Sequence, residues 1–182
     1  MRPKDITLSA IMLTILIVCS QIALPIGPIP ITLQTLAVLM IGFLLPPKKT
    51  LVVTSLYIIA GLIGLPFFSG FTGGFQSVLL PSFGFVFSFI LAAFIQAWYL
   101  STVKALRTSH LIFAGFLNIL ITYMIGLPYM AGILNVYMGS NIDLTAILMF
   151  GFFPFIPGDL LKLGTSIVIV KRLMPLLKYK EY

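Results

Sequence analysis

The chain has 182 residues, of which 60% are hydrophobic and only 8% are charged, and its net charge is +7. Soluble domains carry roughly 25% charged residues, so this composition excludes a soluble domain of any size and predicts an integral membrane protein, a single domain over residues 1–182. The basic residues flank apolar runs instead of forming one stripe, which argues against nucleic-acid binding. The P-loop pattern G-x-x-x-x-G-K-[ST] does not occur, so we expect no ATP hydrolysis by that route.

Six apolar runs approach the roughly 20 residues that a helix needs to cross a bilayer. In chain order, the predicted spans are residues 6–24, 30–45, 50–65, 82–103, 111–133 and 157–173. A further apolar segment, Leu144 to Phe153, is too short to cross alone and is followed by Pro154 and Pro157, which break helices. We therefore expect a half-helix or re-entrant piece leading into the sixth span, within an all-α membrane bundle of six transmembrane helices.

The distribution of basic residues supports six spans. Ten of the eleven Lys and Arg residues fall on one side of this topology: Arg2, Lys4, Lys48, Lys49, Lys104, Arg107, Lys171, Arg172, Lys178 and Lys180. The connections on the other side, 25–29, 66–81 and 134–143, contain none. The positive-inside rule then predicts that both termini are cytoplasmic.

The connection between the third and fourth spans differs in character from the basic connections. Residues 66–81 are uncharged and rich in glycine and aromatic side chains. We expect this outer loop to fold back over the bundle as a lid, with Gly70, Gly73 and Gly74 supplying unusual backbone dihedrals. The alternative is a surface loop with scattered apolar residues.

Asp159 and Lys162 are the most informative pair in the sequence. No other charged residue lies between Asp143 and Lys171. Three residues apart, the two side chains share one face of a helix, and they precede Lys171 by roughly 18 and 14 Å at 1.5 Å per residue. A charge at such depth costs on the order of 3 kcal/mol, so we predict a ligand site there; the alternative is an ion pair that only locks the sixth span to a neighbour.

Other polar side chains within the spans are weaker candidates. Gln34 and Asn118 carry amides that are hard to satisfy by chance, and Tyr123 lies in the fifth span near Asn118. Thr35 and Thr122 are expected to hydrogen-bond to neighbouring helices. No cluster of Cys, His or carboxylate residues indicates a metal, and no nucleophile or metal constellation indicates an enzyme.

Four stretches resemble, in order, the BioY family, the biotin-binding S components of energy-coupling factor (ECF) transporters. They are residues 29–36 (IPITLQTL), 64–85 (GLPFF, then GG, then PSFGF), 123–129 (YMIGLPY) and 154–162 (PFIPGDLLK). The resemblance implies high-affinity capture of biotin from outside a prokaryotic cell membrane. It also implies uptake with a transmembrane T component and two cytoplasmic ATPases, with no cofactor besides the transported biotin.

The resemblance also implies site residues. Asp159 and Lys162 would belong to the biotin site, with weaker candidates at Gln34, Gly73, Gly74, Phe85, Asn118 and Tyr123. Two departures stand out. The family loop often reads P-T-G-G-Y where this chain has PSFGF at 81–85, and the A-x-x-x-A docking motif of the first helix is here Ala10 followed by Thr14.

Biotin chemistry suits an apolar pocket with a few polar groups, since a lysine can neutralise its carboxylate and a carboxylate can accept its ureido N–H bonds. The sequence leaves open which residue meets which end of the ligand. Three alternatives remain: an S component for another vitamin such as thiamin, a stand-alone proton-coupled carrier using Asp159, and an intramembrane enzyme with Asp159 and Lys162 as acid and base. A cationic ligand such as thiamin would want unpaired acids or an aromatic cage, whereas Lys162 neutralises Asp159.

Overall fold

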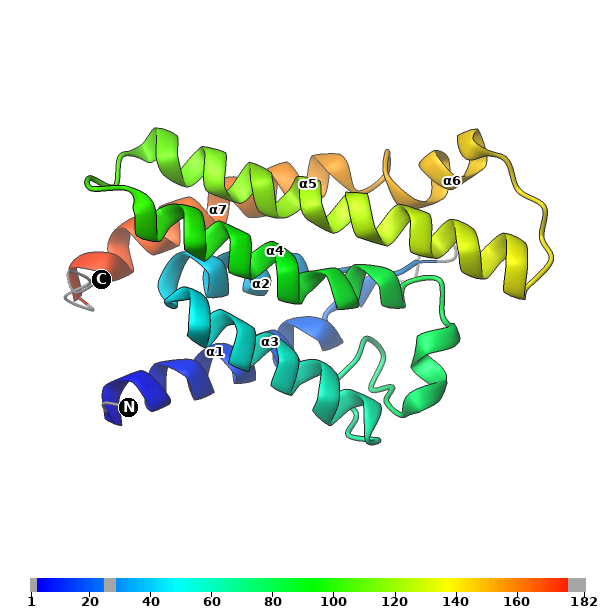
Figure 1. Cartoon of the computed structure of the whole chain (residues 1–182), viewed down its shortest axis with the longest axis horizontal. Coiled ribbons are helices and arrows are strands. Elements are labelled where there is room, and N and C mark those ends of the chain that lie inside the picture. The colour runs from blue at the N-terminus through cyan, green and yellow to red at the C-terminus, as the bar shows by residue number, and fades with distance from the viewer. Residues whose placement is uncertain (1–2, 25–28, 177–182) are drawn as a thin grey trace.

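The computed structural model describes residues 3–24 and 29–176, and these are mainly helical, as the sequence predicts (Figure 1). The helices are α1 (Pro3–Gln21), α2 (Gln34–Leu44), α3 (Pro47–Leu62), α4 (Phe83–Thr102), α5 (Thr108–Gly132), α6 (Leu144–Gly151) and α7 (Ile156–Leu176). A 3₁₀ turn, η1 (Phe75–Leu79), precedes α4, and a π-helical segment, η2 (Ile133–Tyr137), continues α5. Two short strands, β1 (Ala23–Leu24) and β2 (Ile31–Thr32), pair antiparallel.

The hairpin changes the boundaries predicted for the first two spans. Helix α1 ends at Gln21 instead of Leu24, and α2 begins at Gln34 instead of Pro30. The cause is the pairing of β1 with β2, together with Pro30, which keeps the preceding residue extended. With 11 residues, α2 is about 16 Å long at 1.5 Å per residue, shorter than the hydrocarbon core of a bilayer.

Helix α3 begins three residues before the predicted start. Pro47 occupies its first turn, where the missing N–H costs nothing, so Lys48 and Lys49 belong to the helix. The Lys49 Nζ lies 2.8 Å from Asp5 Oδ2 on α1, which ties these two helices together. The helix ends before Gly64, whose φ of +111° is accessible mainly to glycine.

Within residues 3–24 and 29–176, three segments are long and apolar enough to cross a membrane by length and composition: Phe83–Thr102, Thr108–Tyr137 and Leu144–Pro175. The third contains the predicted break, because α6 ends at Gly151 and α7 begins at Ile156. Asp143 caps α6, its carboxylate accepting the Ala146 backbone N–H at 2.9 Å. The half-helix expected at 144–153 is therefore a separate short helix.

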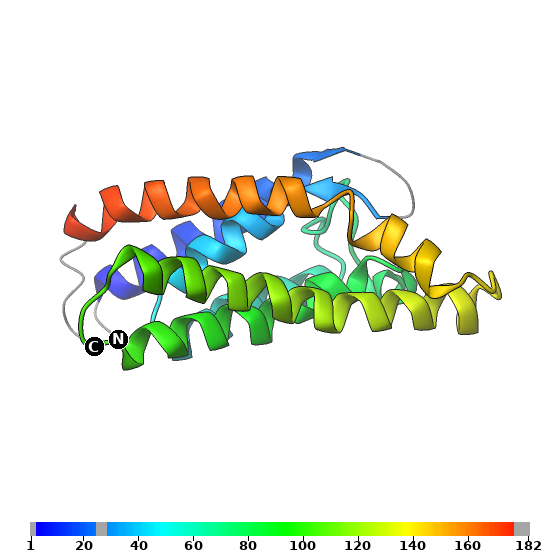
Figure 2. The ribbon, with the colours of Figure 1, turned by 90° about the horizontal axis from the view of Figure 1, so that it is seen from above.

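The two ends of the molecule differ in the elements and the basic residues that they carry. Figures 1 and 2 show the N-terminus, the α2–α3 and α4–α5 connections and the C-terminal end of α7 at one end, and α6 and the loop between α3 and α4 at the other. The first end carries Lys48, Lys49, Lys104, Arg107 and Lys171.

Helix α2 lies in the interior, where most of its side chains, including Leu39, Ile41 and Phe43, are fully buried. A short central helix is thus enclosed by longer ones.

The loop between α3 and α4 folds back onto the helices. Phe68 is buried, with its ring edge-on to Tyr57 (5.7 Å between centroids) and to Phe83 (5.9 Å). The last residues of α1 hold the loop backbone: Ser20 Oγ donates to the Phe67 carbonyl at 2.5 Å, and Gln21 Oε1 accepts the Phe71 N–H at 2.7 Å. Three helices therefore fix the position of this loop.

Candidate ligand-binding site

A cavity of about 250 Å³ opens near the end of the molecule that carries the loop. Its walls come from β2 and the residues before it, α2, the α3–α4 loop, α4, α5, the α6–α7 connection and α7. The lining residues are Ile29, Pro30, Thr32, Gln34, Thr35, Phe68, Ser69, Thr72, Ser77, Leu80, Pro81, Ser82, Phe83, Phe85, Val86, Phe89, Thr122, Tyr123, Phe155, Asp159 and Lys162. A mainly apolar wall with a few polar groups is typical of sites for small organic ligands.

Three helix N-termini meet at this cavity. The first residues of α2 and α4, Gln34 and Phe83, line it directly, and α7 begins at Ile156, one residue after the lining residue Phe155. Unpaired N–H groups give each helix N-terminus a partial positive charge. The local electrostatics therefore favour a negatively charged group in the cavity.

The predicted pair, Asp159 and Lys162, lies on the cavity wall. Lys162 Nζ is 3.1 Å from Asp159 Oδ1, and the two residues are only 9% and 5% exposed. Asp159 occupies the first turn of α7, where the macrodipole favours a carboxylate. Removing either charge would leave the other buried without a counter-charge, which typically costs 3–5 kcal/mol.

Thr35 and Tyr123 complete a four-residue cluster with this pair. Thr35 Oγ1 donates to Asp159 Oδ1 at 3.1 Å and accepts from Lys162 Nζ at 2.9 Å. Tyr123 Oη donates to Asp159 Oδ2 at 2.5 Å. The sequence predicts for Thr35 only a hydrogen bond to a neighbouring helix. Thr35 does bond to another helix, and its partners are the charged pair itself.

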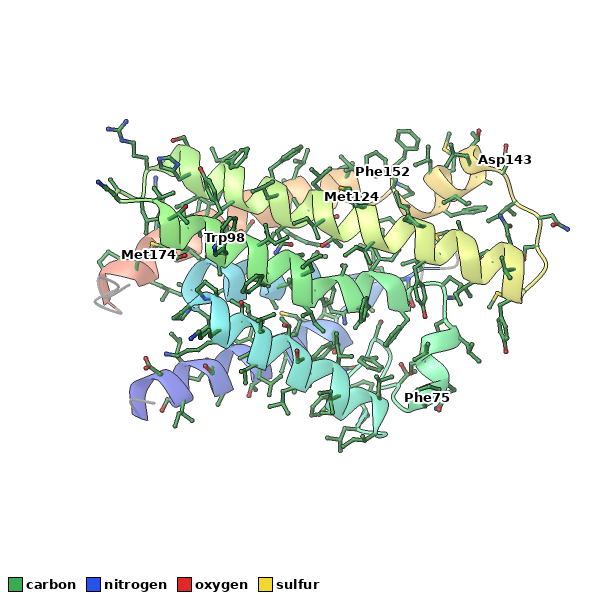
Figure 3. All side chains as sticks on the ribbon, in the orientation of Figure 1. Phe75, Trp98, Met124, Asp143, Phe152 and Met174 are labelled. Carbon is green, nitrogen blue, oxygen red and sulfur yellow. The ribbon has the colours of Figure 1, made fainter. Side chains whose placement is uncertain are left out.

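Aromatic rings hold Tyr123 in place. The Phe85 ring lies edge-on to it at 6.1 Å, and the Phe152 ring, labelled in Figure 3, lies edge-on at 4.9 Å. Phe85 thus serves as an apolar wall and a support for Tyr123, and the hydroxyl of the family's usual tyrosine is not needed for that role. The phenol is consequently fixed toward Asp159.

The four-residue cluster retains bonding capacity toward the cavity. Lys162 has three N–H donors, and the described part of the chain supplies acceptors for two of them. Asp159 Oδ2 accepts one recorded bond and an ionised carboxylate oxygen can accept about two. One donor and one acceptor therefore remain for a bound molecule.

Comparison with known proteins identifies the family. The BioY family model matches residues 1–179. This chain belongs to the BioY family. The resemblance predicted from the four motifs is therefore confirmed, and it extends over nearly the whole chain.

Individual BioY relatives agree closely in length. The biotin transporter BioY of Lactococcus lactis is 34% identical over 175 residues, which cover 94% of this chain and 91% of the relative. The BioY protein of Pyrococcus horikoshii is 32% identical, covering 95% of this chain and 98% of the relative. A crystal structure described as the S-component for biotin from an ECF-type ABC transporter matches with a TM-score of 0.83 and 31% identity, covering 94% of this chain and 91% of that one.

Gln34 connects the cavity of this BioY chain to the loop. Its Oε1 accepts from Thr32 Oγ1 at 2.9 Å, and its Nε2 donates to Tyr57 Oη at 2.7 Å. Tyr57 in turn donates to the Phe67 carbonyl at 2.9 Å. The amide predicted as a site residue therefore lines the cavity and also anchors the loop through one tyrosine.

Asn118 lies outside the cavity lining. Its Nδ2 donates to Gln96 Oε1 on α4 at 2.7 Å, and Gln96 Nε2 donates to the Leu39 carbonyl on α2 at 3.1 Å. The two amides are buried and join three helices through one another. The structure therefore gives Asn118 a packing role and does not bring it to the predicted ligand.

Gly73 and Gly74 also lie outside the lining and act on the backbone instead. The Gly74 N–H donates to the Gly61 carbonyl at the end of α3 at 2.7 Å, with φ at +97°. A Cβ at Gly73 would overlap the Leu65 and Gly61 carbonyl oxygens. Both glycines let the loop approach α3 closely, so that Ser69, Thr72 and Ser77 reach the cavity in their place.

The predicted docking residues lie far from this site in the chain and on the outside of the bundle. Ala10 and Thr14 are exposed on α1, and Thr14 Oγ1 donates to the Ala10 carbonyl at 3.0 Å. The hydroxyl is thereby satisfied within the helix.

Residues 3–24 and 29–176 contain no group of three or more His, Cys, Asp and Glu residues that could hold a metal ion.

Proposed function

We propose that this chain captures biotin from outside the cell and works as the S component of an ECF transporter. Two findings support the proposal: the relatives include a protein named as a biotin transporter, and the similar solved structure is described as an S-component for biotin. The observation that carries it within the molecule is the buried cluster around Asp159 and Lys162, which keeps a donor and an acceptor open to a cavity.

The ligand's chemistry matches this cavity. Biotin combines a carboxylate, a neutral ureido ring and an apolar thioether ring with its chain. The three helix N-termini favour the carboxylate, while the Asp159 oxygen can accept a ureido N–H. Apolar lining such as Phe85, Phe89 and Phe155 provides surface against which the rings lose their contact with water.

We further propose a six-span arrangement in the prokaryotic cytoplasmic membrane, with both termini inside. The basic end of the bundle would face the cytoplasm and the cavity would open outward. Helix α2 is too short to cross alone, and the extended β1–β2 hairpin at its N-terminus would complete its path. Such non-helical backbone is acceptable at membrane depth where it lines a cavity.

Energy for uptake would come from partner proteins: a transmembrane T component and two cytoplasmic ATPases. Ala10 and Thr14 on α1 are the proposed docking residues. Their small side chains allow another helix to approach closely, and the internal bond of the Thr14 hydroxyl leaves no polar group demanding a partner on that face.

The competing functions are less well supported. BioY proteins are transporters, which excludes the intramembrane enzyme. A thiamin-type cation would face three helix N-termini and a carboxylate already neutralised by Lys162, and both are unfavourable for a positive charge. A stand-alone proton-coupled carrier would require Asp159 to change protonation during transport, although its carboxylate is held by Lys162, Thr35 and Tyr123.

Calorimetry of the detergent-purified protein against a panel of vitamins tests the ligand. We expect submicromolar binding of biotin and none of thiamin; thiamin binding in its place would overturn the assignment.

Liposomes containing the purified chain should show no ATP hydrolysis. ATP-dependent biotin accumulation should appear only when the T component and ATPases are added, whereas accumulation driven by a proton gradient alone would favour the carrier.

A further inference from the structure

One buried hydroxyl of the cavity wall lacks a partner. Thr122 on α5 is only 4% exposed, and its Oγ1 is the buried side-chain polar atom without a hydrogen-bond partner among the residues that the structure describes. Thr122 lines the cavity. Leaving a buried hydroxyl without a partner costs free energy, so its position calls for a reason.

Other helical threonines in this chain satisfy themselves. The hydroxyls of Thr14, Thr54 and Thr165 each donate to the carbonyl four residues earlier, at 3.0, 2.7 and 2.8 Å. This local bond is the common solution for threonine inside a helix. Thr122 could use the Asn118 carbonyl in the same way, but no such bond is present, and the Asn118 side chain is bonded to Gln96.

We propose that the Thr122 hydroxyl donates a hydrogen bond to an uncharged polar group of the bound molecule, which for biotin is the ureido carbonyl oxygen. This inference rests on the proposed function and extends it to the orientation of the ligand. Thr122 becomes a specificity-determining residue whose bond forms only when the cavity is occupied.

The placement of charges argues for an uncharged partner. Thr122 is the lining residue of α5 that lies farthest from its C-terminal end, and Phe89 is the one farthest along α4 from the N-terminus. The residue after Thr122, Tyr123, donates to the Asp159 carboxylate, so a carboxylate of the ligand placed beside Thr122 would approach a like charge.

The one cation of the lining, Lys162, already has a counter-charge. Lys162 Nζ is held by Thr35 and Asp159, which lie in the first turns of α2 and α7. A carboxylate beside Thr122 would therefore meet a cation that Asp159 already neutralises. A neutral ureido group meets no such penalty there.

Two variants separate ligand binding from structure. Thr122→Val keeps the shape and removes the hydroxyl, so biotin affinity measured by calorimetry should fall at least fivefold. The ligand-free protein should unfold at the same or a higher temperature, because an unpaired buried hydroxyl is gone. Thr122→Ser retains the hydroxyl and should bind within about twofold of the wild type.

Biotin analogues identify the partner atom. The Thr122→Val penalty should persist for biotinamide, which lacks the carboxylate charge, and shrink for the analogue whose ureido oxygen is replaced by sulfur, a weaker acceptor. A penalty that disappears with biotinamide instead would place the carboxylate at Thr122 and overturn the proposed orientation.

The remaining outcomes are equally decisive. Unchanged biotin affinity in Thr122→Val, or a variant that loses stability without ligand, would overturn the role of Thr122 while leaving the proposed function intact. A wild-type protein that does not bind biotin would instead overturn the proposed function, and the inference with it.

Discussion

Two polar clusters lie inside this bundle, and they differ in how many of their hydrogen-bonding groups have partners. The pair Gln96 and Asn118 bond to each other and to the Leu39 carbonyl, away from the cavity. The cluster around Asp159 and Lys162 is also largely buried, yet it lines the cavity and keeps one donor and one acceptor without a partner among the described residues. Burial of a polar side chain therefore does not mark a ligand site; unfilled bonding capacity beside a cavity does.

The largest effect is expected from breaking the second cluster. Lys162→Ala or Asp159→Ala should weaken biotin binding by at least tenfold, about 1.4 kcal/mol, because each removes one of the groups left for the ligand. Titration calorimetry measures the change. Each variant also leaves one charge buried and unpaired, which destabilises the fold by about 3–5 kcal/mol.

The double variant Asp159→Asn, Lys162→Met controls for that destabilisation by removing both charges. It should fold but bind poorly. If the folded double variant binds biotin as tightly as the wild type, the pair is only a structural lock between α7 and α2.

Disrupting the pair Gln96 and Asn118 should have the opposite effect: stability should fall while biotin affinity is kept. Gln96→Leu preserves much of the buried volume but leaves the Asn118 amide N–H without its acceptor, so stability should fall by about 1–3 kcal/mol. Thermal unfolding in detergent measures this. Biotin affinity should stay within about twofold, and a tenfold loss in the folded variant would mean that the site extends to this cluster.

A smaller effect is expected where the site meets the loop. Tyr57→Phe removes the bridge from Gln34 to the Phe67 carbonyl, a loss of about 0.5–1.5 kcal/mol. The loop should loosen, and biotin should dissociate several-fold faster in a chase experiment. Tyr99→Phe is the matched control, because it removes a phenol bonded to His110 outside the cavity lining. Equal biotin dissociation rates in the two variants would show that the loop does not retain the ligand.

The smallest effect on binding is expected from α1. Ala10→Trp should leave biotin affinity unchanged while reducing co-purification with the T component and uptake. Ile11→Trp offers a control on a neighbouring face of the helix, where a large exposed side chain is already present. Normal assembly of Ala10→Trp would place docking elsewhere, and lost biotin binding would connect α1 to the cavity.

Charge and hydropathy were sufficient to predict the helical fold and to draw attention to Asp159 and Lys162. A charged residue in an apolar run is visible in one dimension. The sequence could not show that Gln34 lines the cavity and Asn118 does not. The role of each amide depends on its hydrogen-bond partner, Tyr57 or Gln96, which another helix supplies.

Small hydroxyl residues show the same limit. Thr35 and Thr122 look alike in the sequence, but one bridges the charged pair and the other has no partner within the described residues. The start of the second span was placed four residues too early for a related reason: strand pairing between β1 and β2 competes with the helix, and it joins residues that are not neighbours in the sequence.

The outer face of α7 constrains how a ligand can leave. Leu160 and Leu161 are 54% and 73% exposed on the same turn that holds Asp159 and Lys162 toward the interior. In a bilayer, rolling this helix about its axis would carry charges into lipid at a cost of several kcal/mol, so the membrane itself fixes the rotational setting of α7. We therefore expect the ligand to leave through uncharged parts of the cavity rim, such as the α3–α4 loop, while α7 does not rotate.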